Sequence, residues 1–231
     1  MSEFDGRVIV VTGATGGLGG AVARAFLDAG AIVAGVSREL AGKAPAGRKY
    51  LEVTADVATP EGARMAVDSV LAATGRIDAL AHLVGGFDGG QSVVETTDEV
   101  WNRMMGLNLN AAFYTMRAVL PHMLQAGRGR IVAVGSRTGV EPAAGLSAYG
   151  ASKAALTTLV RTIAAEVRLS GITANVVLPS VIDTPANRAA MPAADYTRWV
   201  KPASIARLIL WLASDAAADT SGAAVPIYGR A

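Results

Sequence analysis

Short runs rich in β-branched residues alternate with longer segments of helical periodicity along the chain. Such runs are typical of buried strands, and an apolar repeat every three to four residues is typical of helices. Their alternation predicts βαβ units, with a parallel sheet covered by helices on both faces. The expected strands are 7–11, 32–36, 51–53, 79–84, 131–134, 173–178 and 224–228, and the expected helices are 18–29, 60–73, 97–125, 147–169 and 202–213.

The whole chain, residues 1–231, is therefore expected to form a single-domain α/β structure, a doubly wound and mostly parallel sheet of the Rossmann type. With 231 residues, of which 52% are hydrophobic, it can bury one large core, and no linker-like shift in composition divides it. Its 21 basic and 19 acidic residues are scattered, so the sequence has no electrostatic signature of nucleic-acid binding. A small-molecule substrate is the expected partner.

Several other classes are disfavoured by what the sequence lacks. It contains no cysteine, which excludes disulfides and thiolate metal ligands. The N-terminus is acidic where a secretory signal is basic, and no apolar run has membrane-spanning length. We therefore expect a cytoplasmic protein that does not enter a membrane. The two histidines, His82 and His122, have no acidic partner at ligand spacing, so no metal site is expected, and His82 is expected to be a buried structural imidazole.

A glycine-rich loop follows the first expected strand directly. Gly13, Gly17 and Gly19 form the pattern GxxxGxG. Glycines at this place allow a tight turn, a close approach of the backbone to a pyrophosphate, and close contact between strand and helix, with the helix N-terminus facing the phosphates. Thr15 and Leu18 lie in the same loop. We expect all five residues to contact a dinucleotide.

The end of the second expected strand bears on the choice of dinucleotide. An acidic residue commonly stands here and binds the adenosine ribose. This chain instead has Ser37 followed by Arg38, so no carboxylate repels a 2′-phosphate and a guanidinium is available to bind one. This favours NADP(H). NAD(H) stays possible, because Arg38 could be a solvated loop residue.

Two further loops are expected to line the dinucleotide crevice. Only 19 residues separate Ser37 from Asp56, which predicts an abbreviated crossover. Asp56 and Val57 follow the third strand, where the carboxylate could accept a hydrogen bond from adenine or could simply stabilise a turn. Gly85 begins a glycine-rich loop after the fourth strand, at the edge where ligands of open α/β sheets bind.

A tyrosine and a lysine four residues apart supply the candidate chemistry. On a helix, Tyr149 and Lys153 share one face. A nearby ammonium lowers the pKa of a phenol from its usual value of about 10, which would make Tyr149 an acid-base group, although a packed ring and a solvated amine are the alternative. Ser136, at the end of the fifth strand, could return beside the phenol. Asn108 lies deep in a helix, which a kink holding an ordered water would explain.

The segment after the sixth expected strand is the last candidate part of the site. Thr184 is expected near the nicotinamide end of the dinucleotide, and 186–199 is expected to form a lid over the substrate. Pro179, Val181 and Ile182 precede it and are expected cofactor contacts.

Together these residues resemble the short-chain dehydrogenase/reductase family over essentially the whole chain. The matching features are the TGxxxGxG loop, Asn108, Ser136, the Tyr149–Lys153 pair, and the turn with Pro179 and Thr184.

The resemblance implies a role for each residue of the candidate site. Tyr149 would be the acid-base catalyst, and Lys153 would lower its pKa and bind the nicotinamide ribose. Ser136 would polarise the substrate carbonyl, and Asn108 would support a proton-relay water. The resemblance also implies a homodimer or homotetramer paired through the two long helices.

Some positions depart from the family pattern. The usual Asn-Asn-Ala-Gly is replaced by residues 82–85, His-Leu-Val-Gly, and the usual Pro-Gly turn is Pro179-Ser180. The loop 85–90 and the segment 183–199 resemble the dihydropteridine reductase branch, whereas Ser37-Arg38 and Ser136 do not. The leading hypothesis is an NADP(H)-dependent carbonyl reductase or alcohol dehydrogenase for small apolar substrates. The alternatives are a quinonoid dihydropteridine reductase and a non-catalytic NADP(H)-binding sensor.

Overall fold

The computed structural model describes residues 3–39 and 49–230. Within them lies one parallel sheet with the strand order β3-β2-β1-β4-β5-β6-β7. The strands are β1 (Val8–Thr12), β2 (Ile32–Ser37), β3 (Tyr50–Thr54), β4 (Ala79–His82), β5 (Gly129–Val134), β6 (Ile172–Pro179) and β7 (Ala224–Ile227). The α-helices are α1 (Gly19–Asp28), α2 (Pro60–Thr74), α3 (Asp98–Met105), α4 (Ala111–Ala126), α5 (Ser147–Glu166), α6 (Pro185–Ala190) and α7 (Pro202–Leu212).

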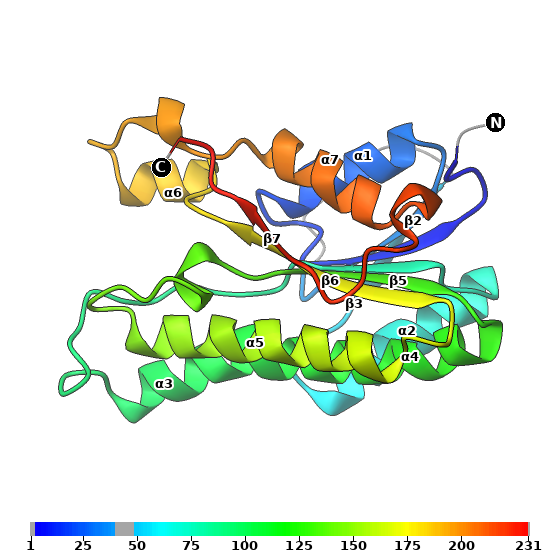
Figure 1. Cartoon of the computed structure of the whole chain (residues 1–231), viewed down its shortest axis with the longest axis horizontal. Helices are drawn as coiled ribbons and strands as arrows, with labels where there is room; N and C mark the ends of the chain where they lie inside the picture. The colour runs from blue at the N-terminus through cyan, green and yellow to red at the C-terminus, as the bar shows by residue number, and fades with distance from the viewer. Residues whose placement is uncertain (1–2, 40–48, 231) are drawn as a thin grey trace.

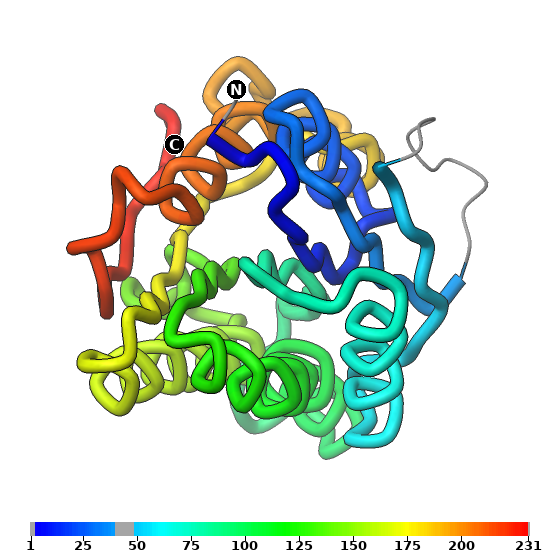
Figure 2. Tube along the Cα trace, turned by 90° about the vertical axis from the view of Figure 1, so that its right-hand side faces the viewer, coloured from blue at the N-terminus to red at the C-terminus, as the bar shows by residue number. Residues whose placement is uncertain are grey.

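The sheet separates two layers of helices. Figures 1 and 2 show α1 and α7 on one face and α2, α4 and α5 on the other. The strand order reverses between β1 and β4, so the chain winds outward in both directions from the centre of the sheet. The predicted doubly wound α/β fold is therefore confirmed.

Burial along the central strands follows from this layering. All five residues of β1 are buried, because helices cover the sheet on both sides. Val8 and Val10 belong to the apolar cluster under α2, α4 and α5, whereas Ile9 and Val11 belong to the cluster under α1 and α7. Continuous apolar strands are thus a direct consequence of the two-sided core.

Most predicted boundaries shift by one to three residues, and two of the differences concern the candidate site. The fourth strand ends at His82, not at residue 84, because the chain turns into a glycine-rich loop there. The predicted helix 97–125 is divided into α3 and α4 by a π-helical turn, Gly106–Asn110. The predicted abbreviated crossover after β2 includes residues 40–48, which lie outside the described residues.

Local signals explain where α2 begins and ends. Thr59 caps its N-terminus by accepting a hydrogen bond from the backbone N–H of Gly62, and Pro60 occupies the first turn, where no N–H donor is needed. Gly75 ends the helix with a φ of +73°, a conformation that glycine adopts at low cost.

None of the helices in residues 3–39 and 49–230 has the length and apolar character that a membrane-spanning segment needs.

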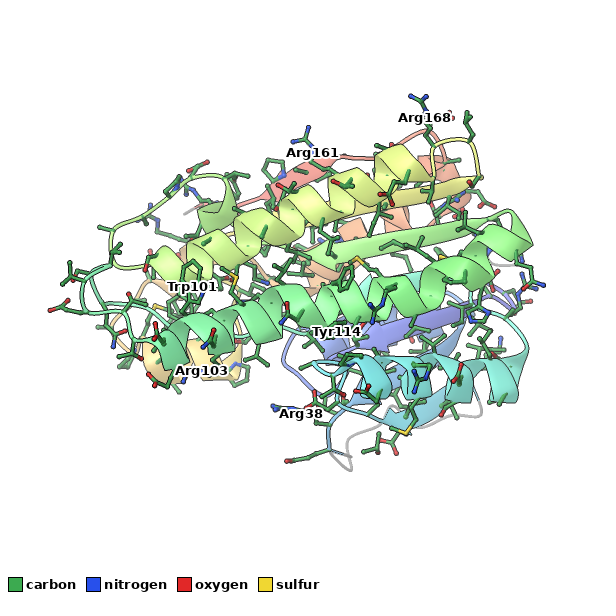
Figure 3. The ribbon with its side chains drawn as sticks, turned by 90° about the horizontal axis from the view of Figure 1, so that it is seen from below. Arg38, Trp101, Arg103, Tyr114, Arg161 and Arg168 are labelled. Carbon is green, nitrogen blue, oxygen red and sulfur yellow. The ribbon has the colours of Figure 1, made fainter. Side chains whose placement is uncertain are left out.

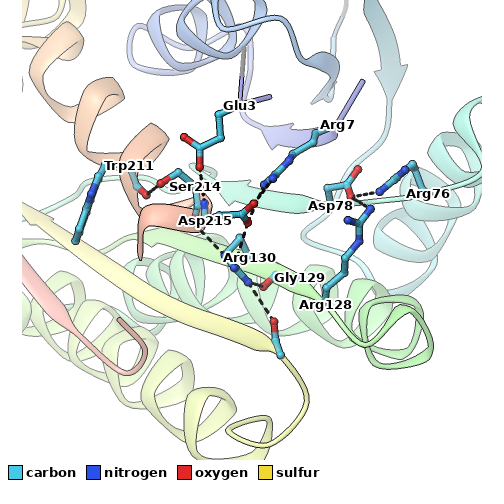
Figure 4. Close-up of polar contacts among 11 residues, drawn as sticks. Glu3, Arg7, Arg76, Asp78, Arg128, Gly129, Arg130, Trp211, Ser214 and Asp215 are labelled. Atoms are coloured by element: carbon cyan, nitrogen blue, oxygen red, sulfur yellow. Dashed lines mark hydrogen bonds and ion pairs between the residues drawn. The ribbon is translucent and has the colours of Figure 1, made fainter. Parts of the chain in front are cut away.

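A group of ion pairs joins the amino ends of the strands, opposite the candidate site (Figure 4). The buried Asp78 carboxylate accepts hydrogen bonds from the Val8 backbone N–H at 2.9 Å, from Arg76 at 2.6 Å and from Arg128 at 2.8 Å. The Asp215 side chain is 63% exposed and pairs with Arg7 and, at 3.5 Å, with Arg130. Burial should make the first carboxylate much more important for stability than the second.

We expect Asp78→Ala to lower the free energy of unfolding by about 2 to 3 kcal/mol, because the buried Val8 N–H would lose its acceptor. Asp215→Ala should cost less than about 1 kcal/mol, because an exposed ion pair is screened by water. Urea unfolding of both variants measures the difference. Equal losses would show that the burial of Asp78 does not determine its contribution.

Candidate active site

The carboxyl ends of the parallel strands meet at one edge of the sheet, on the left of Figure 1, where α6 also lies. The loops after β1, β4, β5 and β6 therefore converge there. Ligands of open α/β sheets bind at this edge where the strand order reverses, here between β1 and β4.

The glycine loop after β1 requires its glycines for steric reasons. A Cβ atom on Gly19 would lie 2.0 Å from the carbonyl oxygen of Gly13, and Gly13 itself has a φ of +69°. Thr15 and Gly17 are exposed, and no side chain caps the N-terminus of α1. The loop thus presents open backbone at a helix N-terminus, which fits a dinucleotide pyrophosphate. Leu18 packs into the core, so only its backbone faces the loop.

Ser37 and Arg38 lie beside this loop. The Ser37 hydroxyl accepts a hydrogen bond from the backbone N–H of Thr15 at 3.2 Å. Figure 3 shows Arg38 on the same side of the molecule as α2, and its side chain is exposed. Its guanidinium forms no ion pair with the described residues, so it is available to an anion next to the glycine loop.

Asp56 and Val57 are placed less favourably for the predicted adenine contact. The Asp56 carboxylate accepts a hydrogen bond from the backbone N–H of Ala58 at 3.0 Å, in the turn that leads to α2. The side chain of Val57 is buried in the core. The turn-stabilising role is present, and the adenine contact stays a prediction for the exposed Asp56 and for the backbone of Val57.

Asn108 holds the glycine-rich loop after β4. Its side-chain oxygen accepts from the Gly86 N–H at 2.9 Å, and its amide nitrogen donates to the Gly86 carbonyl at 3.1 Å and to the Ser152 hydroxyl at 3.0 Å. Asn108 is fully buried in the π-helical turn. A Cβ on Gly85 would lie 2.7 Å from its oxygen and 3.1 Å from the Lys153 amine, so only glycine fits there.

Lys153 is buried in the middle of the candidate site. Its side chain extends from α5, is 5% exposed as a residue, and donates from Nζ to the carbonyl oxygen of Val134, the last residue of β5, at 2.9 Å. Burial lowers the pKa of Lys153 to about 8. The amine is therefore still largely protonated at neutral pH and places a positive charge at the strand ends.

Ser136 and Tyr149 come together as the sequence predicted, but the pKa of the phenol does not shift as predicted. Burial raises the pKa of Tyr149 above its usual value of 10.0, and a hydrogen-bonding interaction with Ser136 lowers it by a smaller amount. The expected lowering of this pKa by Lys153 is therefore wrong for this structure. Tyr149 is a protonated phenol at neutral pH, which suits a proton donor.

His82 is buried but only half satisfied. Its Nδ1 lies 3.1 Å from the Thr12 hydroxyl, which also accepts from the Leu83 N–H, while its Nε2 has no hydrogen-bond partner among the described residues. Burial, followed by the charge of Lys153, lowers the pKa of His82 to about 3. The imidazole therefore stays neutral near pH 7 and joins β4 to β1 through Thr12.

The segment after β6 closes the site from the other side. Val181 accepts a backbone hydrogen bond from Val200, and Ile182 pairs with the same residue. Thr184 caps α6 through the Asn187 N–H, and its methyl group lies 3.0 Å from where a Cβ on Gly17 would be. Thr184 thus lies against the glycine loop, directly before the segment 186–199, for which the lid stays a prediction. Pro179 is the buried last residue of β6.

Two residues at the site were not singled out by sequence reasoning. The ring of Phe87 packs edge-on against the ring of Tyr149, with centroids 5.0 Å apart. Ser152 connects the Asn108 amide to the carbonyl oxygen of Tyr149, to which it donates at 2.7 Å. The helical spacing from Tyr149 could have suggested Ser152, but nothing in the sequence places Phe87 against that ring.

Among the described residues, no group of three or more metal-ligating side chains is close enough to hold a metal ion.

A doubly wound sheet with an open glycine turn at the first helix, and with a phenol, a hydroxyl and an ammonium at its strand ends, defines a dinucleotide-binding oxidoreductase.

Comparisons with known proteins identify the family. A family model described as short chain dehydrogenase matches residues 7–195. Short chain dehydrogenase ausX of Penicillium brasilianum is 31% identical, over 98% of this chain and 96% of its own. The 3-oxoacyl-(acyl-carrier-protein) reductase FabG of Escherichia coli (strain K12) is also 31% identical, over 98% of both chains.

A solved structure agrees with these matches. The 3-ketoacyl-(acyl-carrier-protein) reductase from Brucella melitensis, complexed with NADH, has a TM-score of 0.91 at 26% identity, over 98% of this chain and 99% of that one. This protein belongs to the short-chain dehydrogenase/reductase family and is an NAD(P)-dependent oxidoreductase.

Proposed function

We propose that this protein is an NADPH-preferring reductase of carbonyl compounds, and in reverse a dehydrogenase of alcohols, with Tyr149 as its acid-base group. The observation that carries the proposal is the grouping of Ser136, Tyr149 and Lys153 at the carboxyl ends of the strands, where the glycine loop also lies. A hydroxyl and a protonated phenol near each other can hold one carbonyl oxygen between them.

The cofactor would be held by residues that fit its parts. The open glycine backbone at the start of α1 suits the pyrophosphate, and the Lys153 ammonium suits the hydroxyls of the nicotinamide ribose. When bound, the nicotinamide supplies the hydride that the carbonyl carbon receives in reduction. Tyr149 then gives its phenolic proton to the carbonyl oxygen, and the product is an alcohol.

The other two residues of the group support this reaction. The Ser136 hydroxyl donates a second hydrogen bond to the carbonyl oxygen and so stabilises the negative charge that develops there. Lys153 is proposed to bind the nicotinamide ribose with its ammonium, since burial and Ser136, and not Lys153, shift the pKa of Tyr149. Asn108 positions the loop at Gly86 and, through Ser152, the start of α5. We retain its proton-relay role as a proposal.

The preference for NADPH rests on Ser37 and Arg38. Neither Ser37, which ends β2, nor Arg38, which follows it, is acidic; Arg38 is exposed, and the Ser37 hydroxyl is bonded to the Thr15 N–H of the glycine turn. A guanidinium next to that turn can bind a 2′-phosphate through charge-assisted hydrogen bonds.

We expect Arg38→Ala to raise KM for NADPH by about tenfold to a hundredfold, the effect of losing a charge-assisted contact, and to change KM for NADH by less than about twofold. Arg24→Ala, which removes an exposed arginine from α1, is the matched control and should change neither constant. Equal increases for NADPH and NADH in the Arg38 variant would refute the assignment.

The two alternative functions receive less support. None of the relatives and structures named above is described as a dihydropteridine reductase, and Ser136 was already a mismatch with that branch. A non-catalytic sensor would not need the group of Ser136, Tyr149 and Lys153, and the relatives are named as dehydrogenases and reductases.

We also propose a homodimer or homotetramer that pairs through α3, α4 and α5, and a cytoplasmic location, which a chain without cysteine suits. Figure 3 shows the side chains of this helical face, including Trp101, Tyr114 and Arg161. Trp101 is 43% exposed, and Phe113 is partly exposed beside Arg117, whose guanidinium lies 4.9 Å from its ring centroid. Light scattering across a range of protein concentrations would test the assembly.

A further inference from the structure

Phe87 exposes a large apolar surface next to the proposed acid-base group. Its side chain belongs to the loop between β4 and α3 and the residue is 68% exposed. Its ring meets the Tyr149 ring edge-on, at a centroid distance of 5.0 Å and an interplanar angle of 70°. Exposure of a phenyl ring to water is unfavourable, so a ligand that covers the ring gains free energy. The exposed face of Phe87 adjoins the ring of Tyr149.

The loop that carries Phe87 is fixed on both sides of this residue. On one side, Asn108 binds both backbone groups of Gly86. On the other side, the Gly90 N–H donates to the Gly145 carbonyl at 2.8 Å, and Gln91 pairs with Leu146 directly before α5. The ring is therefore held in a defined place although it is exposed, which is what a preformed binding surface needs.

The loop residues next to Phe87 present no unpaired charge. Asp88, which follows Phe87, forms an ion pair with Arg103 of α3. Gly86 and Gly89 have no side chains, and a Cβ on Gly89 would collide with the side chain of Leu146. The charge next to Phe87 is therefore paired, and an apolar substituent would find the aromatic carbon of Phe87 there.

We infer that Phe87 is a specificity-determining residue, and that the substrate carries an aromatic ring directly on its carbonyl or carbinol carbon. This inference rests on the proposed function, because it places the reacting oxygen at Tyr149 and Ser136. One substituent of the reacting carbon then lies beside the Tyr149 ring and reaches Phe87. An aryl ring there gains an aromatic contact in addition to the burial of its own surface and of Phe87.

The experiment compares two ketones that differ only in the substituent that would reach Phe87. With saturating NADPH, kcat/KM is measured for phenyl methyl ketone and for ethyl methyl ketone in the wild type, Phe87→Ala and Phe87→Leu. We expect Phe87→Ala to lower kcat/KM for the phenyl ketone about tenfold, mainly through KM, and that for the ethyl ketone less than about twofold. Phe87→Leu should lie between wild type and Phe87→Ala.

Val94→Ala is the matched control, because Val94 lies in the same connection between β4 and α3 and is 96% exposed. This variant should change kcat/KM for neither ketone. Equal losses on both ketones in Phe87→Ala would overturn the inference, since they would mean that Phe87 only supports the Tyr149 ring. A wild type that reduces the ethyl ketone but does not prefer the phenyl ketone would also overturn it and leave the proposed function intact.

A binding measurement separates this inference from the proposed function. In the presence of NADP⁺, which cannot reduce a ketone, saturation-transfer NMR reports whether the phenyl protons contact the protein. We expect strong saturation of these protons by the wild type and weak saturation by Phe87→Ala. If neither ketone is reduced but this contrast is present, the proposed function fails and the inference stands; equal saturation by both proteins would refute the inference.

Discussion

Tyr149→Phe lowers kcat about a thousandfold in our account, because the variant keeps the aromatic ring but has no proton to give to the carbonyl oxygen. The packing of the ring against Phe87 is unchanged by the loss of one oxygen atom. NADPH binding should therefore change by less than about threefold, since the phenol supplies at most one hydrogen bond to the cofactor. Steady-state kinetics and fluorescence titration with NADPH measure the two quantities.

The control for this prediction is Tyr114→Phe. Tyr114 lies on α4, where the Arg117 guanidinium is 5.4 Å from its ring centroid. Its variant should keep the wild-type kcat. A Tyr149→Phe enzyme with more than about a tenth of the wild-type kcat would contradict the acid-base assignment, because general acid catalysis contributes at least about a hundredfold.

Gly19→Ala has the second largest expected effect. The new methyl group would be 2.0 Å from the Gly13 carbonyl oxygen and 2.7 Å from the Ala14 Cα, both of which belong to the rigid backbone of the turn. The turn must move, which should lower the free energy of unfolding by about 1 to 3 kcal/mol. Displaced phosphate-binding N–H groups should also raise the Kd for NADPH at least about tenfold.

The neighbouring residue provides a matched control. A Cβ on Gly20 meets nothing within 4 Å, and the residue lies in the first turn of α1. Gly20→Ala should therefore leave the Kd for NADPH unchanged and raise the melting temperature slightly, because alanine favours a helix over glycine. If the two variants behave alike in the NADPH titration, the close approach at Gly19 is not what shapes the phosphate site.

The fold could be predicted because its signals are local. β-branched runs, helical periods and the glycine turn each reflect short stretches of chain, and they alternate in the order that a parallel sheet requires. The interruption at Gly106–Asn110 could not be placed in this way. It depends on the contacts of Asn108 with Gly86 and Ser152, which lie far along the chain.

The residues of the candidate site could be proposed from spacing, whereas their electrostatics could not. Helical geometry brings Tyr149 and Lys153 to one face, but the pKa of each depends on how deeply the fold buries it. Burial raises the pKa of Tyr149 and lowers the pKa of Lys153. In an exposed pair, the ammonium would instead lower the pKa of the phenol. The half-satisfied His82 is likewise a consequence of β1 and β4 meeting, which single segments do not reveal.

Contacts between loops are the part of the candidate site that the sequence could not predict. The sequence shows a phenylalanine among glycines, but only the fixed ends of the loop, at Asn108 and Gly145, bring Phe87 against Tyr149. Arg38 was assigned from its place after β2 alone, and its exposure next to the glycine turn agrees with that assignment. Contacts between loops depend on the assembled sheet, so they follow from the structure and not from the pattern.

Deuterium labelling tests directly whether NADPH transfers a hydride to the carbonyl carbon. The protein is given NADPH carrying deuterium at both C4 positions of the nicotinamide, together with phenyl methyl ketone and, separately, ethyl methyl ketone, and the alcohols formed are analysed by mass spectrometry and NMR. We predict one deuterium on the carbinol carbon of the product from wild type, and alcohol formation about a thousandfold slower with Tyr149→Phe. Alcohol without deuterium at that carbon, or NADPH binding with no alcohol from either ketone, would contradict the account.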